Sequence, residues 1–154
     1  TLRKAEKENV RAVDLSSVIY ESVDRIDALA RDKGMDIVMD CPDEGCQVEG
    51  GALLPQVFSN ILENCVKHSG GSKIKISGSG SDGEIVCTIE DDGKGIPKED
   101  RNRIFRKGYT TDEKRGTGLG LFLVDMLSDI YGGKVEVKDS DMGGARFDIH
   151  LNRS

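Results

Sequence analysis

The feature that most limits the fold of this chain is the order in which segments with helical and with strand-like hydrophobic periodicity follow one another. Three segments repeat apolar residues every three or four positions, which is typical of helices that bury one face. Shorter runs alternate apolar and polar residues, which is typical of strands. We therefore expect helices from the Asp14–Ser17 cap region to about Gly34, over 53–68 and over 119–131, and strands over 35–41, 73–77, 84–90, 134–138 and 145–151.

A shorter helical stretch is predicted from Pro97 to Phe105, because proline is well tolerated at a first helical position. The strands before and after the glycine-rich segment 78–83 should form a hairpin. This order of elements predicts an α/β (α+β) two-layer sandwich, with helices packed on one face of a mixed, largely antiparallel sheet.

The chain length of 154 residues and the hydrophobic content of 36% suit one domain, which we place at residues 14–152. Residues 1–13 are rich in charged and amide side chains, and we interpret them as the end of a helix or a linker from something larger. No apolar run approaches the roughly 20 residues that cross a bilayer, so we expect this fragment not to be membrane-embedded. A longer parent chain could still carry an anchor.

The net charge is −6, and the basic residues are scattered apart from a cluster of Arg101, Arg103, Arg106 and Lys107. Non-specific binding to nucleic acid is therefore disfavoured. The four cysteines form no CxxC pair that would indicate zinc. Cys41 and Cys46 could be bridged in an oxidising medium, but we favour a reduced, cytoplasmic protein.

Three polar or glycine-rich segments follow one another in the chain. The first places Asn60, Asn64, Lys67 and His68 within an arc of roughly 100° beside the apolar stripe of the 53–68 helix. Amide oxygens are ligands that Mg²⁺ accepts. Two asparagines in a helix could also simply be solvated.

The second segment, Asp91 to Ile96, sets a carboxylate beside glycines at the end of a strand, where it can hydrogen-bond a flat heterocycle. A plain turn would look the same. The third, Gly116 to Leu121, opens a helix, so its N–H groups can receive phosphate. It fits neither the Walker nor the dinucleotide pattern. In combination, the segments predict a nucleotide site with metal, base and phosphate contacts.

Taken together, these segments resemble the ATP-binding catalytic domain of sensor histidine kinases, within the superfamily that also includes gyrase, heat-shock chaperone ATPases and mismatch-repair ATPases. The resemblance covers about residues 14–151. The sequence NILENCVKHS (60–69) resembles the N box, DDGKGI (91–96) the first glycine box, Ile104-Phe105 the F box, and GTGLGL (116–121) the second glycine box.

This resemblance implies roles for individual residues at the helix and the first loop. Asn64 would bind Mg²⁺, with Asn60 near the phosphates, and Lys67 would neutralise phosphate charge. His68 would lie beside the nucleotide. In the loop, Asp91 would accept from the adenine amino group, while Gly93, Gly95 and Ile96 would admit and line the ring.

The second glycine box would hold the triphosphate through Gly116, Thr117, Gly118, Leu119, Gly120 and Leu121. The polar segment 106–118 is interpreted as a mobile ATP lid, in which Tyr109, Thr110 and Thr111 resemble a family lid pattern. A basic residue is expected directly after the threonines, but Asp112 stands there. Lys114 or Arg115 could supply the phosphate contact instead.

The resemblance favours a kinase over a hydrolase. The superfamily's ATPases carry a water-activating Glu four residues before the metal-binding Asn, and this position is Asn60, an amide that cannot take a proton. Glu63 could assist an acceptor, although a solvated role is favoured. We expect transfer of the ATP γ-phosphate to a histidine on a dimerisation domain that is absent from this chain. Residues 1–13 would be the stub of a helix of that domain, or a linker to it.

The chain's own histidines, His68 and His150, do not lie in an acceptor segment of the dimerisation-helix type. A response regulator with an acceptor aspartate would act downstream, and the isolated domain should be monomeric. Two alternatives remain open. One is an anti-sigma-type protein serine kinase, and the other is a nucleotide-binding module without transferase activity.

Overall fold

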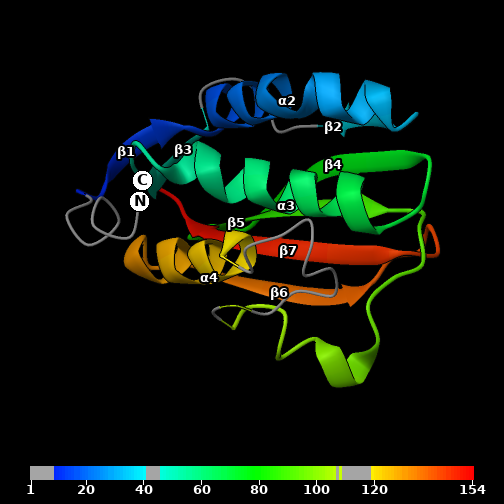
Figure 1. Cartoon of the computed structure of the whole chain (residues 1–154). Helices are drawn as coiled ribbons and strands as arrows, with labels where there is room; N and C mark the ends of the chain where they lie inside the picture. The colour runs from blue at the N-terminus through cyan, green and yellow to red at the C-terminus, as the bar shows by residue number, and fades with distance from the viewer. Residues whose placement is uncertain (1–8, 41–45, 107, 109–118) are drawn as a thin grey trace.

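The computed structural model describes residues 9–40, 46–106, 108 and 119–154. Within these ranges lie three α-helices, one short 3₁₀ helix and seven strands (Figure 1). Their order is β1 (Arg11–Asp14), α2 (Leu15–Asp32), β2 (Asp36–Asp40), β3 (Gln47–Gly50), α3 (Leu54–His68), β4 (Lys73–Gly80), β5 (Glu84–Asp91), η1 (Lys98–Asp100), α4 (Gly120–Ile130), β6 (Lys134–Asp139) and β7 (Ala145–Asn152).

The main sheet has five strands in the order β2-β4-β5-β7-β6. β2 runs parallel to β4, and the other neighbours are antiparallel, so the predicted mixed, largely antiparallel sheet is confirmed. The β4–β5 hairpin is also confirmed. Its turn is shorter than expected, because the pairing continues to Gly80 opposite Ile85.

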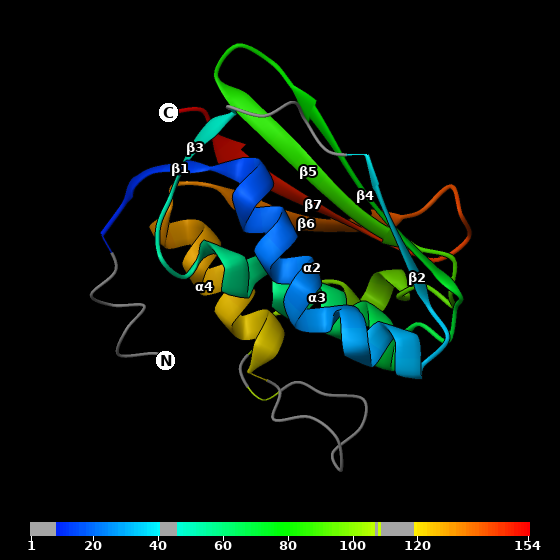
Figure 2. The same cartoon turned by 90° about the horizontal axis from the view of Figure 1, so that it is seen from above.

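The helices α2, α3 and α4 cover one face of this sheet, as the two perpendicular views show (Figures 1 and 2). Inward-facing positions of adjacent strands lie opposite one another: Ile76 pairs with Ile89, and Ile89 with Phe147. All three are fully buried. Because strand side chains alternate between faces, this register gives one apolar face for the helices and leaves the other polar. The predicted two-layer fold is confirmed.

A second, two-stranded sheet forms where β1 pairs with β3, with Val13 opposite the buried Val48. Residues 1–13 were expected to be the end of a helix or a linker, but Arg11 to Val13 belong to strand β1 of this domain, because pairing with β3 outweighs the local propensity. Strand β3 itself was not predicted. Residues 1–8 lie outside the described ranges, so their origin in a dimerisation helix stays a prediction.

The chain enters α2 directly from β1. The carboxylate of Asp14 accepts a hydrogen bond from the backbone N–H of Ser17 at 3.1 Å, which satisfies an otherwise unpaired donor of the first turn. This confirms the predicted cap. No helix in the described part of the chain combines the length and the hydrophobicity needed to cross a membrane.

The helix predicted from Pro97 to Phe105 is reduced to the single 3₁₀ turn η1, followed by irregular turns. Only Ile104 of this stretch is fully buried, at 5% exposure, while Phe105 is half-buried. One anchor provides no continuous apolar stripe, and short helices depend on such a stripe. The predicted short helix is therefore confirmed only at its start, as a 3₁₀ turn after Pro97.

Candidate functional site

The polar residues of α3 lie along the margin of its buried face, as the helical spacing predicted. Phe58, Ile61 and Leu62 on the same helix are fully buried in the core. Asn60 is 9% exposed, and Asn64, Lys67 and His68 are half-buried. A packed helix thus holds the polar set in place at the edge of the core.

Asn60 joins α3 to the beginning of α4. Its Nδ2 donates to the carbonyl oxygen of Gly120 at 3.0 Å, and its Oδ1 accepts from Nε2 of Gln56. Both polar atoms of the amide therefore have protein partners. The contact brings the predicted N box and second glycine box together, although they are 60 residues apart in the chain.

Asn64 and Lys67 differ in their partners. Among the described residues, none hydrogen-bonds the side chain of Asn64, so its amide oxygen remains available for a ligand. Lys67 Nζ lies 2.5 Å from Oε1 of Glu63, one helical turn earlier, in a partly exposed ion pair. Such a pair contributes little to stability, because water screens both charges. The ammonium of Lys67 can therefore change partners at small cost.

Asp91 ends β5 as a buried carboxylate that is 2% exposed. Its Oδ1 accepts from the backbone N–H of Gly93 at 2.9 Å and from that of Ala145 at 3.2 Å. In the described part of the chain, no Lys, Arg or His pairs with it. Two neutral donors fix the group without cancelling its charge, which leaves it a strong acceptor.

Two glycines let the chain approach this carboxylate. A Cβ on Gly93 would lie 2.2 Å from the carbonyl oxygen of Ser69, and one on Gly144 would lie 2.1 Å from Oδ1 of Asp91. Side chains therefore do not fit at either position. Gly93 was expected from the sequence, whereas Gly144 was missed. The Gly143-Gly144 pair between the two last predicted strands was the available signal.

Cys65 lies beneath the same carboxylate and was also missed. Burial raises the pKa of its thiol well above the usual range, and the neighbouring charge of Asp91 and a hydrogen bond to it add to the rise. Cys65 is therefore a neutral S–H group. Within the apolar spacing of α3, nothing distinguishes it from an ordinary core cysteine.

The remainder of the first glycine loop is tied to the end of α3. The N–H of Lys94 donates to the carbonyl oxygen of Ser69 at 2.8 Å. Gly95 adopts a positive φ of 74°, and Ile96 is half-buried against the core. The structure thus places Gly93, Gly95 and Ile96 in one loop between Asp91 and the end of α3.

The second glycine segment is described only from Leu119 onward. Gly120 is the first residue of α4, no described side chain caps this end, and Leu121 is half-buried against the core. The other predicted contacts lie outside the described residues: Tyr109, Thr110, Thr111, Lys114, Arg115, Gly116, Thr117 and Gly118.

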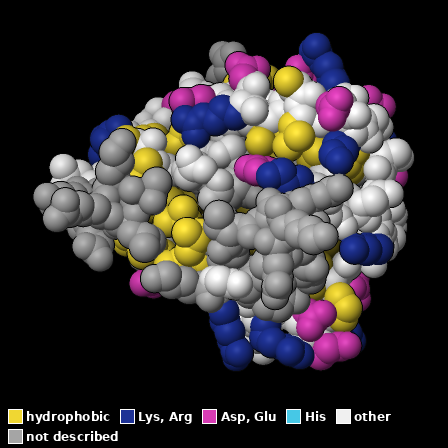
Figure 3. Space-filling model, viewed as in Figure 1, with side chains coloured by type: hydrophobic (Ala, Val, Ile, Leu, Met, Phe, Trp, Pro, Cys, Tyr) yellow, Lys and Arg dark blue, Asp and Glu magenta, His cyan; other side chains and the backbone are white. Residues whose placement is uncertain are grey.

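The cluster of basic residues near η1 is partly neutralised. Arg101 forms an ion pair with Asp139, and Arg103 lies 3.5 Å from Asp100. On the helix side of the molecule, positive and negative side chains are intermingled (Figure 3). On this face, the described basic side chains therefore do not gather into one continuous patch.

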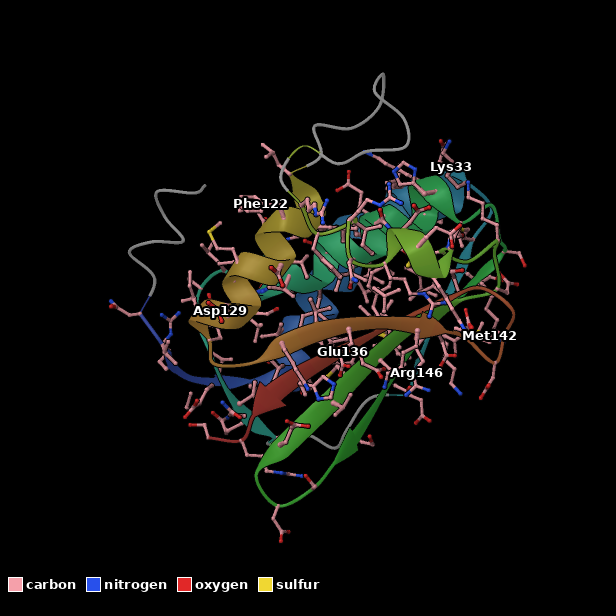
Figure 4. The ribbon with its side chains drawn as sticks, turned by 90° about the horizontal axis from the view of Figure 1, so that it is seen from below. Lys33, Phe122, Asp129, Glu136, Met142 and Arg146 are labelled. Carbon is pink, nitrogen blue, oxygen red and sulfur yellow. The ribbon has the colours of Figure 1, made fainter. Side chains whose placement is uncertain are left out.

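The opposite face of the sheet holds a second buried carboxylate, Asp148 on β7, which is 1% exposed. Its carboxylate accepts hydrogen bonds from Arg146 Nε at 2.9 Å, from Lys138 Nζ at 3.0 Å and from the Thr88 hydroxyl at 2.9 Å. Burial raises its pKa, but these hydrogen bonds outweigh burial, and the net pKa is lowered. Figure 4 shows Arg146 and Glu136 on the neighbouring strands of this side.

A family model described as "Histidine kinase-, DNA gyrase B-, and HSP90-like ATPase" matches residues 51–154. Among curated proteins, the two-component sensor PhoQ of Pseudomonas aeruginosa is 34% identical over 139 residues. This alignment covers 89% of the chain and 31% of PhoQ, so the chain spans under a third of that relative.

Solved structures agree with this match. The mycobacterial sensor histidine kinase MprB has a TM-score of 0.81 at 27% identity, with 94% of this chain and 98% of that chain covered. The ATP binding domain of PrrB from Mycobacterium tuberculosis has a TM-score of 0.76 at 26% identity, with the same coverage. The chain therefore belongs to the family of histidine kinase-, DNA gyrase B- and HSP90-like ATPases, and these relatives are sensor kinases.

Proposed function

We propose that this domain binds Mg·ATP and transfers its γ-phosphate to a histidine on a separate dimerisation domain. The observation that carries the proposal is the buried carboxylate of Asp91, held by two backbone N–H groups and unpaired with any described cation. Such an acceptor suits the amino group of adenine. Gly93, Gly95 and Ile96 would surround the ring.

The metal would rest on Asn64. The described residues contain no group of three or more His, Cys, Asp or Glu side chains that could hold an ion by themselves. A Mg²⁺ ion bound through one amide oxygen, phosphate oxygens and water fits this donor set. When bound, the ion supplies charge neutralisation for phosphoryl transfer.

The remaining contacts would hold the phosphates. Lys67 would exchange its partner Glu63 for phosphate oxygens, with His68 beside them. The N–H groups from Gly116 to Leu121 would receive the phosphates at the helix start. Tyr109, Thr110 and Thr111, with Lys114 or Arg115, would form the lid over them.

Asn60 supports a kinase rather than a hydrolase. Its amide oxygen and nitrogen each have a protein partner, in Gln56 and Gly120, and an amide cannot accept the proton of an attacking water. Phosphoryl transfer can proceed by positioning and charge neutralisation, with the acceptor supplied by a partner. We place Glu63 near that acceptor in a minor, assisting role.

The partners follow from this chemistry. The acceptor histidine would belong to a dimerisation domain in the parent chain, of which residues 1–8 would be a stub or linker. A response regulator would then take the phosphate onto an aspartate. We place the domain in the cytoplasm, as a monomer when isolated, with residues 14–152 as the catalytic unit.

Calorimetry and a transfer assay test the proposal together. We expect Mg·ATP to bind with a millimolar or smaller Kd, and Asn64→Ala to remove most of the Mg²⁺ dependence of that binding. Labelled ATP should pass its γ-phosphate to a histidine-bearing dimerisation domain supplied in trans. Absence of any ATP binding by the wild type would contradict the proposal.

The chemical stability of the product separates the alternatives. A phosphohistidine is lost in acid and survives base, whereas a phosphoserine survives acid. An acid-stable product on a partner protein would favour the serine kinase. Binding of ATP without any transfer would favour a module that only binds nucleotide.

A further inference from the structure

The carboxylate of Asp92, the residue directly after Asp91, accepts hydrogen bonds from groups of the protein itself. Its Oδ1 accepts from the backbone N–H groups of Ser72 at 2.8 Å and Lys73 at 3.0 Å. Its Oδ2 accepts from the Ser72 hydroxyl at 3.0 Å. The hydrogen bond from the N–H of Ser72 has the largest effect among these interactions, which together lower the pKa of Asp92. This carboxylate is therefore ionised at neutral pH.

These bonds join two parts of the site that come from distant segments of sequence. The backbone N–H of Asp92 donates to the carbonyl oxygen of Lys73 at 3.3 Å, and that of Lys94 donates to Ser69 at 2.8 Å. Residues 69–73 directly follow α3. The loop that carries Asp91 is thus attached to the end of the helix that carries Asn64 and Lys67.

We propose that Asp92 is a positioning residue, which sets the spacing between the base-binding Asp91 and the metal- and phosphate-binding face of α3. This inference rests on the proposed function of the site. A nucleotide contacts both ends at once, so its affinity depends on their separation, and misplacement by about 1 Å is costly. Asp92 controls that separation without touching the ligand.

Gly71 offers an independent way to disturb the same contact. A Cβ at this position would lie 2.3 Å from Oδ1 of Asp92 and 2.8 Å from the backbone nitrogen of Gly93. Gly71→Ala therefore displaces the Asp92 carboxylate without removing it, and it also disturbs the backbone of Gly93, which donates to Asp91. Asp92→Ala removes the carboxylate, and Asp92→Asn keeps an oxygen that can accept from Ser72 and Lys73.

Matched controls lie in the exposed β4–β5 turn. Asp82 is exposed, and a Cβ on Gly83 would meet nothing within 4 Å. Asp82→Ala and Gly83→Ala therefore repeat the same chemical changes away from the site. Thermal unfolding of every variant without ligand identifies any loss of folded protein.

The test compares Mg·ADP, which spans both ends of the site, with adenosine, which reaches only the base end. We expect Asp92→Ala and Gly71→Ala to weaken Mg·ADP by about tenfold, the size of one charge-assisted hydrogen bond. Adenosine binding by Asp92→Ala should change by less than about threefold, since Asp91 keeps its own backbone donors in that variant. Asp92→Asn should restore most of the Mg·ADP affinity.

A purely structural role would weaken both ligands equally, in proportion to the folded protein lost, and this would overturn the inference. Unchanged Mg·ADP affinity in both variants would overturn it as well. In either case the proposed function would stand, because the wild type would still bind. Failure of the wild type to bind Mg·ADP would instead overturn the proposed function and this inference with it.

Discussion

Asp91 and Asp148 are both almost completely buried, on strands that lie side by side, yet their surroundings are opposite. Asp148 lies on the face away from the helices and contacts Arg146 and Lys138. Asp91 lies at the end of β5 near α3 and accepts from two backbone N–H groups and the neutral Cys65 thiol, and no described Lys, Arg or His pairs with it.

The difference separates a carboxylate used for the fold from one that, in the proposed function, is reserved for a ligand. A buried charge is costly unless it is paired, and the cations around Asp148 meet that requirement within the chain. At Asp91 the backbone only orients the group. The remaining acceptor capacity is then directed to whatever enters the site.

The largest expected effect follows from Asp91→Asn. The substituted amide presents a donor to the adenine amino group, so we expect the Kd for ADP to rise by about 100-fold, within the range for a hydrogen bond to a charged group. Calorimetry measures it, with Asp148→Asn as the matched control. Equal losses of affinity in both variants would remove the distinction between the two carboxylates.

Asp148→Asn should act on stability instead. The change removes the charge that Arg146 and Lys138 share, and we expect the free energy of unfolding to fall by about 1–3 kcal/mol. Denaturant unfolding measures this change, while the Kd for ADP should stay within about twofold of the wild type. A stable variant with poor nucleotide binding would contradict the assignment.

The same carboxylate predicts a pH dependence. Because hydrogen bonds lower the pKa of Asp148 in the folded state, its stabilising contribution is present above the unfolded value of about 3.9. The contribution is lost as the pH falls through the lower, folded pKa. Unfolding between about pH 5 and 2 should show a smaller loss of stability for Asp148→Asn than for the wild type.

Glu63→Gln should produce the smallest effect. The Glu63–Lys67 pair is partly exposed, so its loss should change stability by about 0.5 kcal/mol or less. Lys67 then has no competing carboxylate, and we expect Mg·ADP to bind up to about fivefold more tightly, with the gain reduced by salt. Tighter binding that persists at high salt would contradict this account.

Most of the fold could be predicted from the sequence, because the apolar stripes of α2, α3 and α4 and the alternation in β4 to β7 are long enough to be read locally. The strands β1 and β3 could not. Each has four residues, and their pairing depends on contacts between Val13 and Val48 that are distant in sequence. The helix predicted after Pro97 is shorter than expected for the opposite reason. Its local preference for helix is not supported by enough packing against the rest of the fold.

The site shows the same division. Asp91, Gly93 and the polar face of α3 were predicted because each segment carries a recognisable pattern. Gly144, Cys65 and Asp92 act through contacts with Asp91, Gly93 or Ser72 across the fold, and no local pattern identifies such partners. The sequence was therefore more informative about the groups that are expected to contact a ligand than about the groups that hold those groups in position.

Strand β3 anchors both described ends of the chain, through β1 on one side and the bridge between Val48 and Arg153 on the other. Helix α3 then leads from β3 to residues 69–73, which hydrogen-bond the glycine loop after Asp91, over a length of about 22 Å for its 15 residues. The core buries one face of α3 from Leu54 to Val66, so a change at the anchored ends would reach the site only by moving packed side chains along this length.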